Sequence, residues 1–314
     1  MLMLQFIPER ASAAAPDVDH LYFFLLGVAA VFSLLIFVLI FYFALRYRRR
    51  PGNEVASLVH EAVPLEVAWI VVPFLLTIIM FVWGAKLFSD QARPPATSDV
   101  IFVVGKQWMW KLQHLEGNRE IDELHVPVGR PIKLVMTSED VIHDFFIPAF
   151  RVKKDVLPGR YTSIWFQPTK PGRYHFFCSQ YCGTEHSLMK GWVTVMEPAE
   201  YEEWLNRGAT GESMASAGER LFQKLNCADC HQAADTALGP SLAGKFGKTE
   251  MLLRGRSVPV DEGYIRDSIL TPNAEQVAGY KPIMPTYKGQ VTEDQLLQLI
   301  AYIKSLAAPE RKTQ

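Results

Sequence analysis

Two long runs without charged residues mark the N-terminal part of the chain, at residues 21–45 and 67–85. At about 1.5 Å of rise per residue, they form helices of roughly 37 Å and 28 Å, enough to cross a hydrocarbon core of about 30 Å. Both runs are too long and too apolar for buried helices of a soluble core. The pattern therefore predicts transmembrane helices at residues 21–47 and 63–88.

Four arginines between positions 46 and 50 lie at the start of the loop predicted between these helices, residues 48–62. The flanking segments carry few basic residues, so the positive-inside bias places this loop in the cytoplasm and both chain ends outside. Residues 1–20 are then an extracytoplasmic segment. The Ser-Ala-Ala-Ala run at residues 12–15 resembles a signal-cleavage site, but no basic region precedes it, so the sequence leaves cleavage undecided.

After about residue 98 the pattern changes to short runs of β-branched and aromatic residues. Turn signals such as Glu-Gly-Asn at residues 116–118 and Lys-Pro-Gly at residues 170–172 separate these runs. Short strands at this spacing predict an all-β sandwich or barrel of about 100 residues, which we assign to residues 98–197. The predicted strands are residues 100–104, 131–136, 161–166, 172–178 and 191–196.

The last part of the chain has the periodicity of helices. Residues 198–207 are predicted to form a short amphipathic helix, and small polar residues follow it, so we assign residues 198–213 to a linker. Thr292 and Gln295 have the spacing of a capping box at the start of a helix. An all-α domain is predicted over residues 214–308, with helices at residues 217–225, 261–270 and 292–306.

The composition excludes some classes of function. The chain has 314 residues and a net charge of −1, so nothing in it favours binding to nucleic acid or another polyanion. Four cysteines are too few for a disulfide-stabilised fold, but they lie in two close pairs. The close spacing within each pair therefore indicates metal binding or cofactor attachment rather than structural disulfide bonds.

The first pair belongs to a C-x3-C-x3-H-x2-M array formed by Cys178, Cys182, His186 and Met189, and His143 lies upstream of it. Two thiolates, two imidazoles and a thioether form a soft ligand set that favours copper over hard cations. The set has one cysteine more than a single blue-copper centre requires, and two thiolates can bridge a pair of copper ions. A disulfide and a structural zinc site are the alternatives, and neither explains the placement of His186 and Met189.

The second pair forms the C-x-x-C-H haem attachment signature with Cys227, Cys230 and His231. Both thiols can reach the haem vinyl groups, and the histidine can bind the iron from one side. A thioredoxin-like motif is the alternative, but no βαβ pattern surrounds it. No histidine follows His231, so Met251 and Met284 are the candidates for the sixth ligand. We assign Met284, which lies in a proline-stiffened loop before the last helix.

Four motifs together resemble the cytochrome c oxidase subunit II family, and the resemblance covers roughly residues 20–197. It implies a cupredoxin domain whose dinuclear copper centre, CuA, is held by the five residues above and by the backbone carbonyl of Gln180. The C-terminal domain resembles a class I cytochrome c with one covalently bound haem c. The motifs are residues 105–110 (Gly-Lys-Gln-Trp-Met-Trp), 140–148 (Asp-Val-Ile-His-Asp-Phe-Phe-Ile-Pro), 157–160 (Leu-Pro-Gly-Arg) and the copper loop, residues 178–189.

The resemblance implies roles for four further residues. Trp108 matches an aromatic residue at the electron-entry surface, with core packing as the alternative. Glu66 matches the mouth of a proton pathway, with a solvated interfacial charge as the alternative. Arg160 matches a position that braces the interface with subunit I. Gln180 stands where the family usually has a glutamate that also reaches magnesium, and an amide is a poorer ligand for that hard cation.

The order of these parts implies subunit II of a proton-pumping terminal oxidase in a bacterial cell membrane, with both redox domains outside the cytoplasm. Electrons are expected to pass from an external donor, such as cytochrome c or a quinol–cytochrome c reductase, to the haem c and then to CuA. They continue to the haem and CuB of subunit I, where O2 is reduced, and subunit III is a further expected partner. A short flexible linker would hold the haem domain at about millimolar effective concentration.

Three other functions share parts of this pattern. The CuA-bearing small subunit of a nitric oxide reductase can have the same order of domains, and the partner subunit distinguishes it. A quinol oxidase subunit II keeps the helices and the cupredoxin but lacks the copper ligands, which are all present here. A membrane-anchored electron carrier without an oxidase partner would purify alone.

Overall fold

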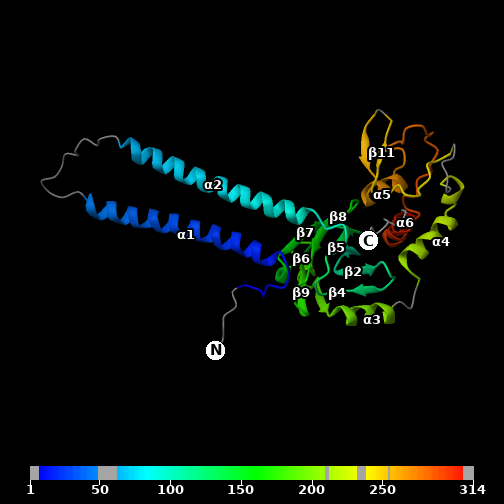
Figure 1. The fold of residues 1–314 in the computed structure, drawn as a ribbon, viewed down its shortest axis with the longest axis horizontal. Helices are drawn as coiled ribbons and strands as arrows, with labels where there is room; N and C mark the ends of the chain where they lie inside the picture. Colours follow the sequence, from blue (N-terminus) through cyan, green and yellow to red (C-terminus); the bar gives the residue numbers. More distant parts are fainter. Residues whose placement is uncertain (1–6, 49–61, 209–211, 232–237, 254, 307–314) are drawn as a thin grey trace, which may run out of the picture.

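The computed structural model describes residues 7–48, 62–208, 212–231, 238–253 and 255–306. Most of the predicted cytoplasmic loop, with two of its four arginines, lies outside the described residues. Figure 1 shows three parts in chain order: a pair of long helices, a β-domain and a C-terminal helical region. This arrangement confirms the fold class predicted from the sequence.

The two long helices are α1 (Ala15–Arg46) and α2 (Val63–Ala92), and both are long and apolar enough to cross a membrane. They run side by side away from the β-domain (Figure 1), with the ring centroids of Phe24 and Trp83 5.5 Å apart. No part of their most apolar windows is buried within the chain, as expected for helices that cross a membrane.

α1 begins before the predicted membrane span because its first turns are bound to the β-domain. The Arg151 guanidinium donates to both carboxylate oxygens of Asp19, at 2.8 and 3.1 Å, and Arg10 donates to the same carboxylate at 2.7 Å. Ahead of the helix, the Ala11 N–H donates to the Ala149 carbonyl at 3.0 Å. A bidentate arginine–carboxylate ion pair is strong and directional, so it fixes the orientation of α1 relative to the sheet.

The β-domain is a sandwich of two five-stranded sheets, ordered β3-β2-β1-β5-β8 and β4-β10-β9-β6-β7. Most neighbours are antiparallel, but β1 pairs with β5 and β4 with β10 in parallel. The five predicted strands are present as β1, β5, β8, β9 and β10, and the other five were not predicted. The strands are β1 (Asp99–Lys106), β2 (Met109–His114), β3 (Arg119–Ile121), β4 (Glu123–Pro127), β5 (Ile132–Ser138), β6 (His143–Ile147), β7 (Val152–Val156), β8 (Thr162–Phe166), β9 (Gly172–Cys178) and β10 (Lys190–Met196).

Strand β1 is buried on both of its faces. Ile101 and Val103 point into the core between the two sheets, together with Trp110 of β2. Phe102 and Val104 point outward and are 0% and 2% exposed, because residues of the C-terminal region cover them. The first sheet is therefore the middle layer between the second sheet and the helical region.

The C-terminal region contains α4 (Met214–Lys224), α5 (Glu262–Leu270) and α6 (Glu293–Ser305), in agreement with the three predicted helices. Thr292 and Gln295 form the predicted capping box. A Cβ on Gly218 of α4 would lie 2.0 Å from the Gln298 carbonyl of α6, so only glycine allows these helices to cross this closely. A short hairpin of β11 (Thr249–Met251) and β12 (Ser257–Pro259) was not predicted.

The short helix predicted at residues 198–207 is present as α3 (Pro198–Gly208), and it packs on the sandwich. Tyr201 and Leu205 are 2% and 6% exposed, and the Trp204 ring stacks on His125 with centroids 4.6 Å apart. Residues 209–211 lie outside the described part of the chain. The connection is therefore anchored to the β-domain along α3.

Candidate copper and haem sites

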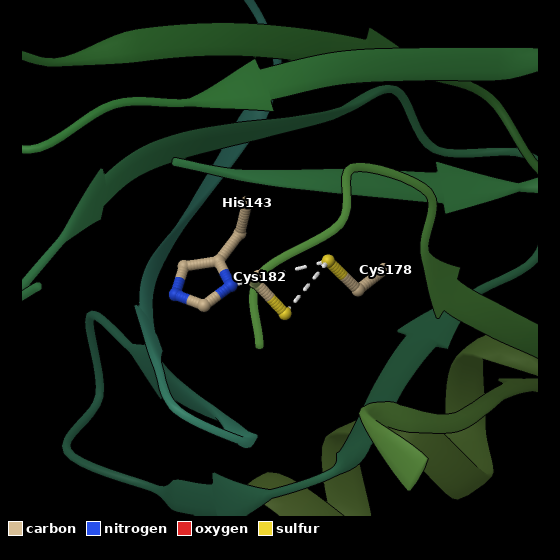
Figure 2. Close-up of side chains that lie close together, drawn as sticks. All are labelled: His143, Cys178 and Cys182. Atoms are coloured by element: carbon tan, nitrogen blue, oxygen red, sulfur yellow. Dashed lines mark hydrogen bonds between the residues drawn. The ribbon is translucent and has the colours of Figure 1, made fainter. Parts of the chain in front are cut away.

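The predicted copper ligands converge at one end of the second sheet. Strand β9 ends at Cys178 and pairs with β6, which begins at His143. The loop after β9 turns back through the short helix η2 (His186–Leu188) into β10 and carries the second cysteine. Figure 2 shows His143, Cys178 and Cys182 facing a common centre.

The donor atoms lie at distances that suit a shared metal site. The Cys178 sulfur lies 3.9 Å from His143 Nδ1 and 3.2 Å from the Gln180 carbonyl oxygen. The Cys182 sulfur lies 3.4 Å from His186 Nδ1 and 3.8 Å from the Met189 sulfur. The other four groups named from the sequence therefore lie around this pair of cysteine sulfurs, which makes six groups in all. Together they are two thiols, two imidazoles, a thioether and a carbonyl, a set that fits copper.

The two cysteines are thiols rather than a disulfide. Their sulfur atoms are 3.8 Å apart, whereas a disulfide bond is about 2.05 Å long. Burial, followed by repulsion from the neighbouring Cys178, raises the pKa of Cys182 to about 12. Burial also opposes ionisation of Cys178, but hydrogen bonds with the His143 ring and the Asp144 backbone outweigh it and lower the pKa of that thiol. A metal ion bound between the two sulfurs would hold both as thiolates, since a coordinating thiol is deprotonated.

Asp140 orients the His143 ring. One of its oxygens lies 2.8 Å from His143 Nε2, and the other accepts from the Gln107 N–H at 2.8 Å. With Nε2 held by a carboxylate, Nδ1 is the ring nitrogen that faces Cys178. Burial raises the pKa of Asp140, but the Gln107 N–H and the His143 ring outweigh it, so this carboxyl has a pKa below its usual range. The Gln107 side-chain amide donates to the Cys182 carbonyl at 2.7 Å, so the same segment holds the copper loop.

Trp108 lies against the copper loop and is half-buried on the core of the sandwich. A Cβ on Gly183 of this loop would lie 3.1 Å from Cζ2 of the indole. Four large apolar residues beside the ligands in the sequence are exposed, and our sequence reasoning missed them. They are Val141 at 38%, Ile142 at 46%, Tyr181 at 74% and Leu188 at 62% exposure.

Glu66 and Arg160 are not among the residues that contact the two cysteine sulfurs of the predicted copper site. Glu66 is in the first turn of α2 and is exposed. Arg160 is exposed at the edge of a cleft of about 410 Å³ that lies between the sandwich and the C-terminal region. Within this chain, Arg160 therefore faces the C-terminal region.

The C-terminal region encloses a largely apolar cavity of about 440 Å³. Cys227, Cys230, His231 and Met284 all line it, whereas Met251 is 58% exposed and is not among its lining residues. The structure thus brings the attachment motif together with Met284 rather than with Met251. The volume and the apolar lining suit a flat hydrophobic group such as haem.

The histidine of this cavity is held in one orientation. Its Nδ1–H donates to the Pro240 carbonyl at 2.9 Å, which leaves Nε2 as the ring nitrogen that can bind iron. A Cβ on Gly239 would lie 3.2 Å from Cε1 of the His231 ring. The glycine therefore allows the backbone to approach the imidazole closely.

A third cluster of titratable residues lies on the sandwich near α3 and carried no signal in the sequence. The Glu120 carboxylate lies 2.9 Å from His114 Nε2 and also contacts His125 Nδ1, and His114 Nδ1 lies 3.2 Å from the Tyr201 hydroxyl. Burial raises the pKa of Glu120, but the two histidines outweigh it, so its pKa is below the usual range. The cluster joins separate strands to α3, so local spacing could not reveal it.

Comparisons with known proteins match all three parts of the chain. The models for the transmembrane domain and the periplasmic domain of cytochrome C oxidase subunit II match residues 2–87 and 115–196, and a cytochrome c model matches residues 215–307. Cytochrome c oxidase subunit 2 of Alkalihalophilus pseudofirmus is 30% identical over 301 residues, which cover 90% of this chain and 85% of that protein. The corresponding protein of Thermostichus vulcanus is 29% identical over 276 residues, covering 70% and 84%.

One solved structure is similar to part of the chain. It is the periplasmic domain of subunit II of the cytochrome oxidase of Bradyrhizobium japonicum, with 31% identity and a TM-score of 0.36. The match covers 37% of this chain and 96% of that one.

Proposed function

Because the chain belongs to the cytochrome c oxidase subunit II family, we propose that it is the electron-entry subunit of a haem–copper terminal oxidase that reduces O2 to water. The cytochrome c domain at its C-terminal end implies haem, and the subunit II domain implies copper. The oxygen chemistry and proton pumping belong to subunit I, a separate chain. The single observation that carries the proposal is the convergence of six metal-binding groups in a chain that also holds a haem-sized cavity.

Two copper ions would be held between the Cys178 and Cys182 sulfurs, with His143 on one side and His186 on the other. The Gln180 carbonyl and the Met189 sulfur lie beside different cysteines and are placed as weak outer ligands. Such a pair supplies a one-electron carrier whose charge is shared by two metals. The chain's contribution is a buried, preformed set of donors that changes little when the electron arrives.

One haem c would be bound through Cys227 and Cys230, with His231 and Met284 as axial ligands. Pro240 fixes the orientation of the imidazole, and methionine–histidine ligation raises the potential of a haem, as a donor to an oxidase requires. The proposed order is external donor, haem c, CuA, and then the haem and CuB of subunit I. Candidate external donors are a cytochrome c and a quinol–cytochrome c reductase.

The surface around the copper loop suits contacts with partner proteins. Trp108 is the proposed aromatic residue for electron entry, because its ring lies against Gly183. The exposed Tyr181 and Leu188 lie on the loop itself and are candidates for packing on subunit I. Magnesium is not proposed at Gln180, whose side chain is a neutral amide, and Glu66 remains a proposed proton-pathway mouth.

The proposed location is the bacterial cell membrane, with α1 and α2 spanning it beside subunits I and III. The arginine-rich loop is on the cytoplasmic side, and both termini and both redox domains are on the outer side. The contacts of Arg10 and Arg151 with Asp19 support this arrangement, because they tie the outer end of α1 to the sandwich.

The test is metal and haem analysis of the purified complex, with the partner subunits identified. Cys182→Ser should abolish the near-infrared absorption of CuA and leave the haem c spectrum unchanged. Ser187→Ala, in the same loop but outside the ligand set, is the matched control and should retain both. Persistence of the near-infrared band in Cys182→Ser would refute the assignment of the bridging thiolates. Purification with a nitric oxide reductase subunit would favour the alternative function, and purification of the chain alone would favour a carrier without an oxidase partner.

A further inference from the structure

The outer face of the first sheet is covered by the cytochrome c domain. Residues from both parts form one buried apolar cluster and are at most 4% exposed. A strand with apolar residues on both faces needs a covering layer, and an amphipathic helix provides one. The cluster consists of Phe102, Val104 and Val135 from the sandwich and Met214, Leu297 and Ala301 from α4 and α6.

A buried arginine links the two domains beside this cluster. Arg266 of α5 has a side chain that is 7% exposed, and its Nη1 donates to the Gly159 carbonyl of the sandwich at 2.8 Å. Its Nη2 donates to Glu293 at the start of α6 at 2.5 Å. A guanidinium removed from water needs both a counter-charge and acceptors, and here the acceptors belong to different domains. A separate ion pair joins Lys133 of β5 to Glu262 of α5 at 3.7 Å.

The same helix forms part of the haem cavity. Ile265 and Ile269 of α5 line the cavity, while Arg266, next in the chain, points to the sandwich. The arginine therefore fixes one wall of the cavity against residues 157–160 of the β-domain.

A chain of hydrogen bonds leads from that loop to a copper ligand. Leu157, two residues before Gly159, accepts through its carbonyl from the Ser138 N–H at 3.2 Å. The Asp140 N–H donates to the Ser138 hydroxyl oxygen at 3.2 Å, and Asp140 Oδ1 lies 2.8 Å from His143 Nε2. Short covalent and hydrogen-bonded segments thus connect the cavity wall with the imidazole that faces Cys178. Electron tunnelling is faster along a continuous bonded path than across an open gap.

We propose that the cytochrome c domain is a docked electron donor, and that Arg266 is the positioning residue that holds it on the loop leading to His143. This inference rests on the proposed function, because it assumes haem in the cavity and copper at the thiolates. In each transfer one electron passes from ferrous haem to the oxidised copper pair, and no bond or proton changes place. The sequence predicted a haem domain held by a short flexible linker, whereas in this proposal the domain is fixed on the sandwich.

The test compares Arg266→Gln with Arg256→Gln in the complete purified complex. Arg256 also belongs to the cytochrome c domain and pairs with a carboxylate, Glu275, but it is 62% exposed. In Arg266→Gln, hydrogen exchange in residues 157–161 should rise by at least about tenfold, because a buried charged hydrogen bond is lost. The rate of electron transfer from photoreduced haem to copper should fall severalfold, while both static spectra and both reduction potentials stay unchanged. Arg256→Gln should match the parent protein in each measurement.

Unchanged exchange and an unchanged transfer rate in Arg266→Gln, with both spectra intact, would overturn the docking proposal and leave the proposed function standing. Absence of the copper or haem spectrum in the parent complex would instead refute the proposed function. If the complex with Arg266→Gln does not assemble, Arg266→Lys is the second variant. It keeps the positive charge but lacks the planar guanidinium that binds two acceptors at once, so it should show the same changes more weakly. In the parent protein, the internal transfer rate should not vary between about 0.01 M and 1 M ionic strength, because the contact is buried. A marked salt dependence would overturn the proposal.

Discussion

Two leucines on one helix allow the docking of the cytochrome c domain to be separated from its internal stability. Leu297 and Leu299 of α6 are 1% and 2% exposed. Leu297 packs against Phe102 and Val104 of the sandwich, whereas Leu299 packs in the core of its own domain and lines the predicted haem cavity. Replacing each with alanine removes the same atoms, in one case from the contact between the domains and in the other from the core of the cytochrome c domain.

The expected cost of either change follows from burial. A buried leucine replaced with alanine destabilises a protein by about 2–5 kcal/mol, through lost transfer energy and the cavity left behind. Since about 1.4 kcal/mol corresponds to tenfold, the lower limit raises an opening equilibrium about 30-fold. In Leu297→Ala this cost weakens the contact between the domains. In Leu299→Ala it weakens the cytochrome c domain itself.

The assay is hydrogen exchange at the amide of Met214, whose N–H donates to the Leu115 carbonyl of the sandwich at 3.1 Å. Leu297→Ala should accelerate this exchange about 30-fold or more and leave the haem spectrum unchanged. Leu299→Ala should act mainly on amides of α5 and on the haem spectrum. The reasoning is refuted if Leu297→Ala leaves the Met214 amide as protected as in the parent chain.

Three further outcomes are expected. Met284→Ala should change the reduced haem spectrum, whereas Met251→Ala should not; the reverse result would reassign the axial ligand. Because the pKa of Glu120 is below its usual value of 4.5, its stabilising effect is complete above about pH 4.5 and is lost as the pH falls through the folded-state pKa. In Glu120→Gln, the free energy of unfolding should therefore fall less steeply as the pH is lowered below about 4.5. The same pH dependence as in the parent protein would contradict this. Gly183→Ala places a Cβ against the neighbouring indole and should shift the near-infrared band, while Gly129→Ala, also at positive φ but in open space, should not.

Local patterns in the sequence predicted most of the elements. The apolar runs predicted both long helices, and five strands rich in β-branched residues were found between turn signals. Strand β7 was missed because its sequence, Val-Lys-Lys-Asp-Val, has three exposed polar residues and no regular alternation. The cluster of Cys178, Cys182, His186 and Met189 was predictable because all four lie within one loop, where spacing alone shows that their side chains can meet.

Residues that act through tertiary contacts were not predictable in this way. Asp140 was part of a recognised motif, but its bonds to His143 and Gln107 depend on the folding of separate segments. The cluster around Glu120 joins three strands and α3, so no spacing in the sequence brings it together. Buried polar groups obtain their partners from the fold, and the sequence shows only that each of them needs one.

The docking of the cytochrome c domain did leave a trace in the sequence. Residues 100–104 are all apolar, and a strand with one solvated face would alternate with polar residues instead. In α6, residues 296–301 and 303 are all buried, so this helix is covered around most of its circumference. Both β1 and α6 therefore have an apolar face that their own domain does not bury. The extra apolar faces of β1 and α6 can be buried against each other. This favours a permanent interface between the domains over a domain that moves freely on a flexible linker, even though the residues between the domains are small and polar.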